Sequence, residues 1–564
     1  MSGAARRAEQ DFLEFGRDEQ GQALGWANPD TSVAPVLGGS PRRNARNVSP
    51  RMTTRRTVLT GAGAAAATTV LAGPLEAADA ATVVRRGSTS LLPTQQRHLV
   101  GRFSYGVTPA LAAEVRKHGG AQQWLDWQLQ PGRITDPAGD ATRSWYPTMS
   151  WSVGRIVSET KANNIGGWQI MADYQNWLLV RRMISRRQVL ETMTEFWENH
   201  FNVPVSADGV YTWRKDYGEV IRARALSSFE SLLQAVSVHP AMGLYLGNAV
   251  SDAEHPNENQ GRELLELHTV GLAAGYTEAH VVSSARILTG WQVDMWDTWR
   301  AGYNEIAHWT GKVRVLDFSR ANRSEDGRQL TRDYLHYLAH HPATAQHIAA
   351  KLATVFVSDA PPRALVSHLA KVYLAHGTQI RPVLQALVAS TAFKDSVGDK
   401  IRDPENDLVA TYRLMNVKVA KPDADDRAAH QLLWQAEGMG MMPMSWPAPN
   451  GQPIVGAAWA SPSRVMGSMG THYSMANGWW PSKGIHYPTP ASWLPQPTTR
   501  FDALVEHMAQ RILHRHASSS LQQACRQAVG LAASDQIDAN HPLVKWQFGR
   551  LLTTFFDSPD FLRR

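Results

Sequence analysis

The chain has 564 residues, of which 43% are hydrophobic and 19% are charged, a composition typical of a folded globular protein rather than a disordered or fibrous one. The formal net charge of +7 is modest for this length and the basic residues are scattered, so we expect no nucleic-acid partner. Because Cys525 is the only cysteine, an intrachain disulfide, a thiolate zinc site and an iron–sulfur cluster are excluded.

Residues 1–51 form a polar segment that is rich in Gly, Arg, Asn and Pro and shows no sustained periodicity. We interpret this segment as a disordered extension or as the product of a mis-set start. The second interpretation rests on Met52, which stands immediately before the export signal described next.

Residues 52–80 predict a twin-arginine signal peptide. Arg55-Arg56 precedes a weakly apolar run at 61–71, which is too short and too mild to span a membrane permanently. The small residues of Ala78-Asp79-Ala80 suit a signal peptidase, so we expect cleavage after this triplet. No later stretch approaches ~18 uninterrupted apolar residues. The pattern therefore predicts that the twin-arginine machinery exports the protein to the periplasm or the exterior, without a permanent membrane anchor.

The chain after the signal is predicted to be mainly α-helical. From about residue 93, apolar residues recur three and four positions apart, so we expect one large helical domain over residues 91–564. Thr108-Pro109 is a typical helix start, and His340-His341-Pro342 ends one helix and begins another. The expected helical segments are 178–197, 229–238, 257–270, 277–289, 329–356, 362–373, 380–391 and 501 to the end.

Near residues 438–499 the composition changes to Gly, Pro, Met and Trp. Proline and glycine interrupt regular helices, so we expect this segment to form long ordered loops. The sequence thus predicts a large helical array with an irregular segment that wraps over it.

The densest polar cluster spans residues 257–269. On a regular helix Glu258, Arg262 and Glu266 fall within an arc of about 80°, with Glu263 beside them. Two interpretations are open: a solvated face with an Arg262–Glu266 ion pair, or the wall of a cleft where carboxylates act as acid and base.

A second polar cluster spans residues 195–200 and shares the pattern Glu-x-x-Glu-x-His with residues 263–268. Such a repeat suggests a metal site between helices, but a His two positions after a Glu points about 160° away from it. Only fraying of the first helix at Asn199 would turn His200 back toward Glu195. The alternative divalent-metal ligands are His200, Glu195, Glu263 and Glu266. Otherwise His200 is a helix-end histidine bonded to carbonyls of the last turn.

A further helix is expected to carry Arg286 toward the turn at Gly290-Trp291. Arg286 suits a substrate carboxylate or phosphate, and it equally suits neutralisation of the glutamate face. The sequence contains no nucleophile elbow around a serine, no phosphate-cradling glycine loop and no zincin motif, so these mechanisms receive no support.

Several motifs together resemble the domain-of-unknown-function family numbered 1800, a family of exported bacterial proteins. The motifs are residues 98–106 with Thr108-Pro109, residues 196–197 with 199–201, 239–242, 256–259, 262–267, 288–291 and 341–345, and the resemblance spans about 91–560. It implies that His200, Glu258, Glu263 and Glu266 belong to the family pattern, whereas Glu198 and His268 are not regular members of it. This chain departs from the pattern at Gln452, where the family has Trp after Asn-Gly.

We therefore expect an exported hydrolase that acts on an extracellular or cell-envelope polymer, with polysaccharide as the favoured substrate and glycosidase-like paired carboxylates. The carboxylate-rich face and the 20 tryptophans, whose rings suit sugars, motivate this hypothesis. The candidate catalytic residues are Glu258, Glu263, Glu266 and His200. The candidate substrate-binding residues are Asn257, Asn259, Arg262, Arg286, Trp291 and Asn199.

This hypothesis predicts no cofactor, and two alternatives from other classes remain open. One is a metal-binding or redox protein that takes up a divalent metal and folds before twin-arginine export. The other is a non-catalytic protein of envelope assembly or binding.

Overall fold

The computed structural model of the protein describes residues 90–423 and 428–564. The chain divides into two units, Met1–Ala80 and Ala81–Arg564, and all described residues belong to the second unit. The predicted extension and signal peptide, residues 1–51 and 52–80, lie outside the described residues. Within the described part of the chain, no helix has the length and apolar character that crossing a bilayer requires.

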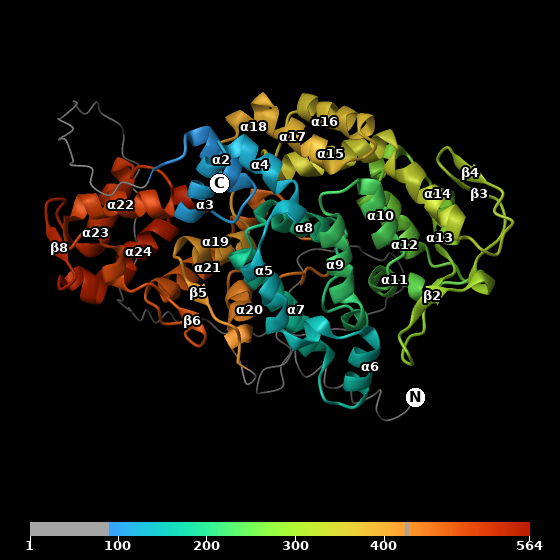
Figure 1. Cartoon of the computed structure of the whole chain (residues 1–564). Coiled ribbons are helices and arrows are strands. Elements are labelled where there is room, and N and C mark those ends of the chain that lie inside the picture. The colour runs from blue at the N-terminus through green and yellow to red at the C-terminus, as the bar shows by residue number, and fades with distance from the viewer. Residues whose placement is uncertain (1–89, 424–427) are drawn as a thin grey trace, which may run out of the picture. The chain divides into compact units, whose positions relative to one another are not determined.

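The second unit is mainly α-helical, as the sequence predicts (Figure 1). Its helices are α2 (Thr94–Arg102), α3 (Pro109–Lys117), α4 (Ala121–Gln128), α5 (Pro137–Ala141), α6 (Val153–Lys161), α7 (Gly167–Ile184), α8 (Gln188–His200), α9 (Arg214–Arg224), α10 (Phe229–Ser237), α11 (Pro240–Leu246), α12 (Glu258–Glu263), α13 (Glu278–Leu288), α14 (Arg328–Ala339), α15 (Pro342–Phe356), α16 (Arg363–Ala375), α17 (Ile380–Ala389), α18 (Thr391–Asp395), α19 (Pro404–Leu414), α20 (Ala428–Gly438), α21 (Pro462–Ala476), α22 (Phe501–Ile512), α23 (Ser519–Val529), α24 (Phe548–Phe556) and α25 (Pro559–Leu562).

The strands of the described residues form only short antiparallel pairs. They are β1 (Trp291–Val293) with β2 (Ala301–Tyr303), β3 (Val313–Val315) with β4 (Phe318–Arg320), β5 (Lys418–Val419) with β6 (Ile485–His486), and β7 (Thr498–Arg500) with β8 (Gln536–Asp538). Because each pair has two strands, the helices and not the sheets supply the core.

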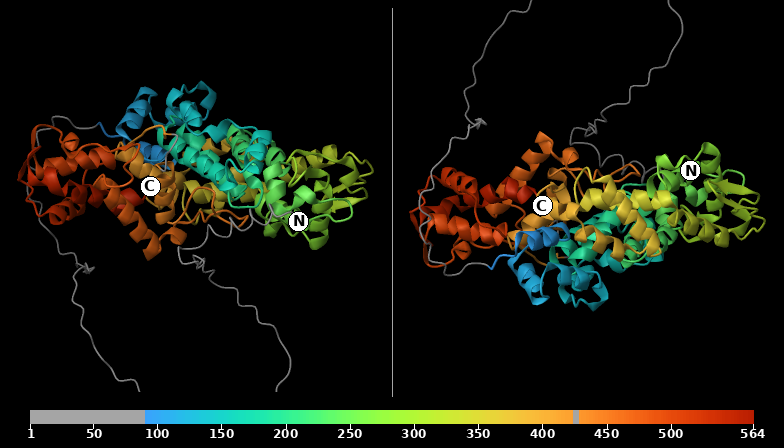
Figure 2. Two further views of the ribbon diagram at one scale, coloured as in Figure 1. Left: turned by 90° about the horizontal axis from the view of Figure 1, so that it is seen from below. Right: turned by 90° about the horizontal axis from the view of Figure 1, so that it is seen from above.

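Two large apolar clusters and one small one form the core of this unit. The first gathers side chains from α2 to α4 and from α8 to α18, and the second joins α7 to the helices from α19 onward. Figure 2 shows α22–α24 at one end of the unit and α10–α14 at the other. The cavity described below lies where α8, whose apolar side chains belong to the first cluster, approaches Asp403, the residue that caps α19 of the second cluster.

Helix starts follow the capping residues of the sequence. Thr108 accepts a hydrogen bond from the backbone N–H of Leu111 (3.1 Å). His239 and His341, each followed by proline, use ring Nδ1 in the same way and accept from the N–H two residues on, at 3.2 and 3.1 Å. The predicted boundary at His340-His341-Pro342 is therefore confirmed, with His341 as the cap of α15.

The predicted helical segment 178–197 is wrong as one continuous element, because it is split between α7 and α8. Ser185 leaves the helical conformation and its hydroxyl donates to Asp136 Oδ2 at 2.6 Å. The second helix, α8, continues through Asn199 to His200, so the fraying that would turn His200 toward Glu195 does not occur.

The segment 257–270 is also less regular than predicted. Helix α12 is followed by a π-helical turn, η6 (Leu264–His268), which Thr269 closes by donating from Oγ1 to the carbonyl of Leu264 (2.6 Å). Because a π-helical turn is wider than an α-helical turn, the side chain of Glu266 does not point in the direction that a regular α-helix predicts. The expected Arg262–Glu266 pair is wrong: the ion pairs of Arg262 go to Glu258 (3.6 Å) and Glu278 (2.6 Å).

The irregular segment 438–499 contains a helix that composition does not predict, α21, of 15 residues. Ser461 caps it by accepting from the N–H of Arg464 (3.3 Å), and proline occupies the first turn. Gly467 lies inside this helix. The position requires glycine, because a Cβ there would stand 2.1 Å from the carbonyl oxygen of Gly438. Glycine thus permits close packing against the end of α20 instead of breaking α21.

Candidate functional site

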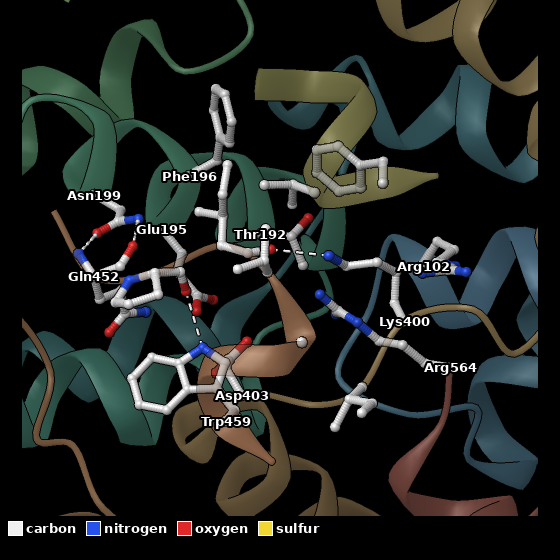
Figure 3. A pocket seen from close by; sticks show the side chains of 17 residues that line it. Arg102, Thr192, Glu195, Phe196, Asn199, Lys400, Asp403, Gln452, Trp459 and Arg564 are labelled. Carbon is white, nitrogen blue, oxygen red and sulfur yellow. Dashed lines mark hydrogen bonds between the residues drawn. The ribbon is translucent and has the colours of Figure 1, made fainter. Parts of the chain in front are cut away.

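A cavity opens where α8, α15, the segment before α19 and the loop 452–459 meet (Figure 3). Its volume is about 70 Å³, so it takes in one functional group of a larger substrate and not a whole drug-sized ligand. Five charged side chains line it. They are Arg102, Glu195, Lys400, Asp403 and Arg564.

Glu195 on α8 is the first carboxyl of the cavity. Its side chain is 14% exposed, accepts a hydrogen bond from the Tyr105 hydroxyl, and lies 4.0 Å from Arg182 Nη1. Burial raises the pKa of Glu195, Asp403 adds to the increase, and Arg182 opposes it. Burial also raises the pKa of Tyr105 well above its usual value, so the phenol stays the donor. Burial therefore shifts Glu195 toward its protonated form, relative to an exposed glutamate.

Arg182 is fully buried behind Glu195 and also makes an ion pair with Glu405. Burial raises the pKa of Glu405 to about 8, with Glu195 adding to the increase. A single guanidinium thus serves two carboxyls, and burial outweighs its effect on the pKa of each.

Asp403 is the second carboxyl of the cavity and stands at the start of α19. Its Oδ1 accepts from the backbone N–H of Asn406 at 2.9 Å, so helix capping fixes its orientation. Figure 3 shows Glu195 and Asp403 on the same side of the cavity, opposite the cationic side chains. Two carboxyls in unlike surroundings are a pattern of acid–base sites.

Three cationic side chains, Arg102, Lys400 and Arg564, face these carboxyls across the cavity (Figure 3). Burial and, to a smaller extent, the neighbouring Arg564 lower the pKa of Arg102 to about 9. Arg102 donates from Nη2 to the carbonyl of Ser396 (2.6 Å), but its buried Nε and Nη1 have no hydrogen-bond partner among the described residues. Three positively charged side chains in one cavity, together with the unused N–H donors of Arg102, favour the binding of an anionic ligand.

Lys400 is anchored on both sides. Its ammonium makes an ion pair with Asp359 and donates to the carbonyl of Ile454 at 2.9 Å. Burial lowers the pKa of Lys400, and Asp359 opposes that decrease. The lysine therefore holds Ile454 of the loop 452–459 while it contributes positive charge to the cavity.

Asn199 holds the first residue of the same loop. Its Nδ2 donates to the carbonyl of Gln452 (3.0 Å), and its Oδ1 accepts from the N–H of Gln452 (2.7 Å). Gly451 has a φ of 73°, and a Cβ there would lie 2.2 Å from the carbonyl oxygen of Asn199. Both bonds to residue 452 use its backbone, so the departure from the family pattern at Gln452 leaves this connection intact.

Two of the residues singled out in the sequence, Glu195 and Asn199, line the cavity, and the glutamates of the segment 257–270 do not. Burial raises the pKa of Glu263, and the neighbouring Glu266 adds to the increase. Glu266 accepts from the Tyr276 hydroxyl at 3.2 Å, whereas Glu258 is exposed beside Arg262. The glutamates of this segment therefore form a separate, partly solvated group.

Asn257 and Asn259 serve local structure at the start of α12. The side chain of Asn257 accepts from the N–H of Asn259 at 2.9 Å and thereby caps the helix. Asn259 donates to the carbonyl of Leu246 at 3.3 Å. Neither asparagine lines the cavity.

His200 lies in a cluster with His268, His347 and Lys351, apart from the cavity. Its Nδ1 accepts from Lys351 Nζ at 3.0 Å, and its Nε2 lies 3.1 Å from the carbonyl oxygen of His268. Burial lowers the pKa of His200 well below its usual value, and Lys351 and His268 lower it further. Burial also lowers the pKa of Lys351 to about 8. His200 and His268, the two histidines of the repeated Glu-x-x-Glu-x-His motif, thus lie near each other, with ring centroids 6.0 Å apart. In the part of the chain that the structure describes, the glutamates of the motif do not join them in a metal-binding group.

The remaining predicted residues lie elsewhere. The Arg286 guanidinium lies 4.3 Å from the centre of the Trp309 ring. Trp291 donates to Thr331 Oγ1 at 3.4 Å and lines a separate cavity of about 200 Å³. The alternative metal set is not brought together: among the described residues, its ligand atoms do not form a group within 4.8 Å of one another. That set comprises His200, Glu195, Glu263 and Glu266.

Sequence reasoning missed Arg102, Lys400, Asp403 and Arg564. Arg102 belongs to the motif 98–106 that carries the family resemblance, and Asp403 precedes a proline in the pattern of a helix start. These two signals were present, but no local spacing connects either residue to Glu195.

Residues 98–563 match the family described as "Protein of unknown function (DUF1800)". The match includes every charged residue of the cavity except Arg564. No curated protein and no solved structure matches the chain.

Proposed function

Since the chain belongs to the DUF1800 family, whose description assigns no activity, we propose a function from the chemistry of the cavity. We propose an exported hydrolase that acts on an extracellular or cell-envelope polymer carrying anionic groups, with polysaccharide as the favoured class. One observation carries the proposal: a glutamate whose pKa burial raises shares a cavity with a second carboxyl and three cations.

In this mechanism Glu195 is the general acid. It gives its proton to the oxygen of the leaving group as the bond to the substrate breaks. Burial raises the pKa of Glu195, which suits a general acid, and Tyr105 and Arg182 hold its orientation. Asp403 acts as the base that removes a proton from water, or as the nucleophile that water later displaces. Water supplies the atoms that complete both products.

The cationic side of the cavity supplies recognition. Arg102, Lys400 and Arg564 suit a carboxylate, sulfate or phosphate group on the polymer. A cavity of about 70 Å³ accommodates such a group while the rest of the polymer lies outside. The twin-arginine pattern of residues 52–80 supports an extracellular or periplasmic substrate.

The test is turnover of defined polymers by the purified protein. Acidic polysaccharides that carry carboxylate, sulfate or phosphate groups are compared with neutral polysaccharides, and new reducing ends are measured. We expect turnover of at least one acidic class, and we expect Asp403→Asn to lower kcat by about 10²–10⁴-fold with its fold unchanged. Saturable binding of an acidic polymer without turnover contradicts the hydrolase and supports a binding protein instead.

A further inference from the structure

A group of one glutamate and two histidines, distinct from the clusters described above, lies on the surface where α10 and α14 pack together. Glu230 stands in the first turn of α10, His336 lies in the last turn of α14, and His340 follows one turn later. His336 Nδ1 is 2.8 Å from Glu230 Oε1, and His340 Nε2 is 2.9 Å from Glu230 Oε2. The three ligand atoms all lie within 4.8 Å of one another.

The backbone under this cluster is fixed by the core. Both helices bury apolar side chains immediately beside the three polar ones. These are Phe229, Leu232 and Leu233 of α10, and Tyr334, Leu335 and Leu338 of α14. Gln234 Nε2 also donates to Glu230 Oε1 at 3.0 Å, so the carboxylate is oriented from its own helix. The cluster is therefore held in place before any ligand arrives.

We propose that Glu230, His336 and His340 bind one divalent transition-metal ion, with Zn²⁺ as the representative ion. Two imidazoles and one carboxylate are a set of ligands that zinc takes in proteins, and water completes a tetrahedral site. With metal–ligand bonds of about 2.0 Å, tetrahedral ligand atoms stand roughly 3.3 Å apart. The ligand atoms at 2.8 and 2.9 Å therefore need to move apart by only about half an ångström.

The geometry also favours a metal over a chance pair of hydrogen bonds. The two histidines approach different oxygens of one carboxylate, and their rings lie close together, with centroids 4.5 Å apart. A helical spacing of four residues brings both rings to one face, so their nitrogens converge on one point. His336 is exposed, which leaves an entry path and a position for water. The bound ion would connect α10 to α14.

This site shares no residue with the cavity and does not depend on the proposed hydrolase activity. Metal binding requires neutral imidazoles, so affinity falls as the pH is lowered and protons compete for the ring nitrogens. Because the site shares no residue with the cavity, a metal bound there would act on the stability of the helix pair and not on the reacting bond.

The experiment measures Zn²⁺ binding to the chelator-treated full protein, purified without a histidine tag. Calorimetric titration with ZnCl₂ and elemental analysis give affinity and stoichiometry. We expect one site per chain that His336→Ala, His340→Ala or Glu230→Gln each weakens at least about tenfold, since even outer-shell changes cost about that much. His376→Ala is the matched control, because His376 is an exposed histidine at the end of α16 and should leave the affinity unchanged.

A thermal melt provides the second readout. Zn²⁺ should raise the midpoint of the wild-type protein and of His376→Ala, and it should not raise that of a double His336→Ala/His340→Ala variant. The double variant replaces two surface side chains of α14 while the buried side chains of the helix stay, so it should remain folded. Wild-type affinity no tighter than that of the double variant, or an equal loss in His376→Ala, overturns the proposal.

Discussion

Replacement of Glu191 by glutamine should destabilise the protein more than any surface carboxylate change. Glu191 on α8 is fully buried and accepts hydrogen bonds from Arg181 Nε (2.6 Å) and from Arg222 Nη2 (2.7 Å). Burial by itself raises the pKa of Glu191, but the two arginines outweigh it and lower the pKa from 4.5 to about 2. A decrease of about 2.5 pKa units corresponds to roughly 3 kcal/mol, within the range expected when a buried ion pair loses one partner.

The sign of the pH dependence follows from the lowered pKa. Stabilisation by Glu191 is fully present above pH 4.5 and is lost as the pH falls through about 2. Urea unfolding at pH 7 should therefore show Glu191→Gln less stable than wild type by about 3 kcal/mol, and the difference should shrink toward pH 2.

Glu159→Gln is the matched control, because Glu159 pairs with Arg155 at 3.7 Å on the surface of α6. Such exposed pairs contribute about 0.5 kcal/mol or less. If Glu191→Gln destabilises no more than Glu159→Gln at pH 7, the account of the buried arginine pair is refuted.

Two further predictions concern the second half of the chain. Burial lowers the pKa of His472, but Asp407 and Asp557 outweigh it and raise the pKa from 6.5 to about 9. Stabilisation by His472 is thus present below pH 6.5 and lost as the pH rises through 9, so His472→Gln should lower the thermal midpoint strongly at pH 6 and little at pH 10. Gly467→Ala places a Cβ 2.1 Å from the carbonyl oxygen of Gly438, so a thermal melt should show destabilisation, although alanine normally favours helices. An unchanged or raised midpoint for Gly467→Ala would mean that α20 and α21 are not tightly packed there.

The fold class could be predicted from the sequence because helical periodicity and capping residues act locally. The His-Pro dipeptide at His341 predicts a helix start and caps α15 in the structure, and His239-Pro240 caps α11 in the same way. The predictions that were wrong concern features that depend on tertiary contacts. The break at Ser185 relies on a hydrogen bond to Asp136, which lies 49 residues earlier. The helix α21 tolerates Gly467 because a neighbouring backbone needs the space.

The site could be predicted only in part, for a related reason. Glu195 and Asn199 are four residues apart, so they share a face of α8, and that face lines the cavity. His200, one position further, points about 100° away and enters the cluster with Lys351. The cationic wall of the cavity, opposite the carboxyls, comes from segments far from α8 in the sequence, such as the one that carries Lys400. No local spacing reveals such neighbours.

In the proposed mechanism the cavity, and not the glutamate group of the segment 257–270, performs the reaction. The most direct test compares kcat/KM of Glu195→Gln and Glu266→Gln on one acidic polymer, with the pH profile of each. We expect that Glu195→Gln loses about 10²–10⁴-fold in kcat/KM, together with the fall in activity at high pH that deprotonation of the general acid causes, while Glu266→Gln stays near wild type. Full activity in Glu195→Gln together with loss in Glu266→Gln would contradict the account.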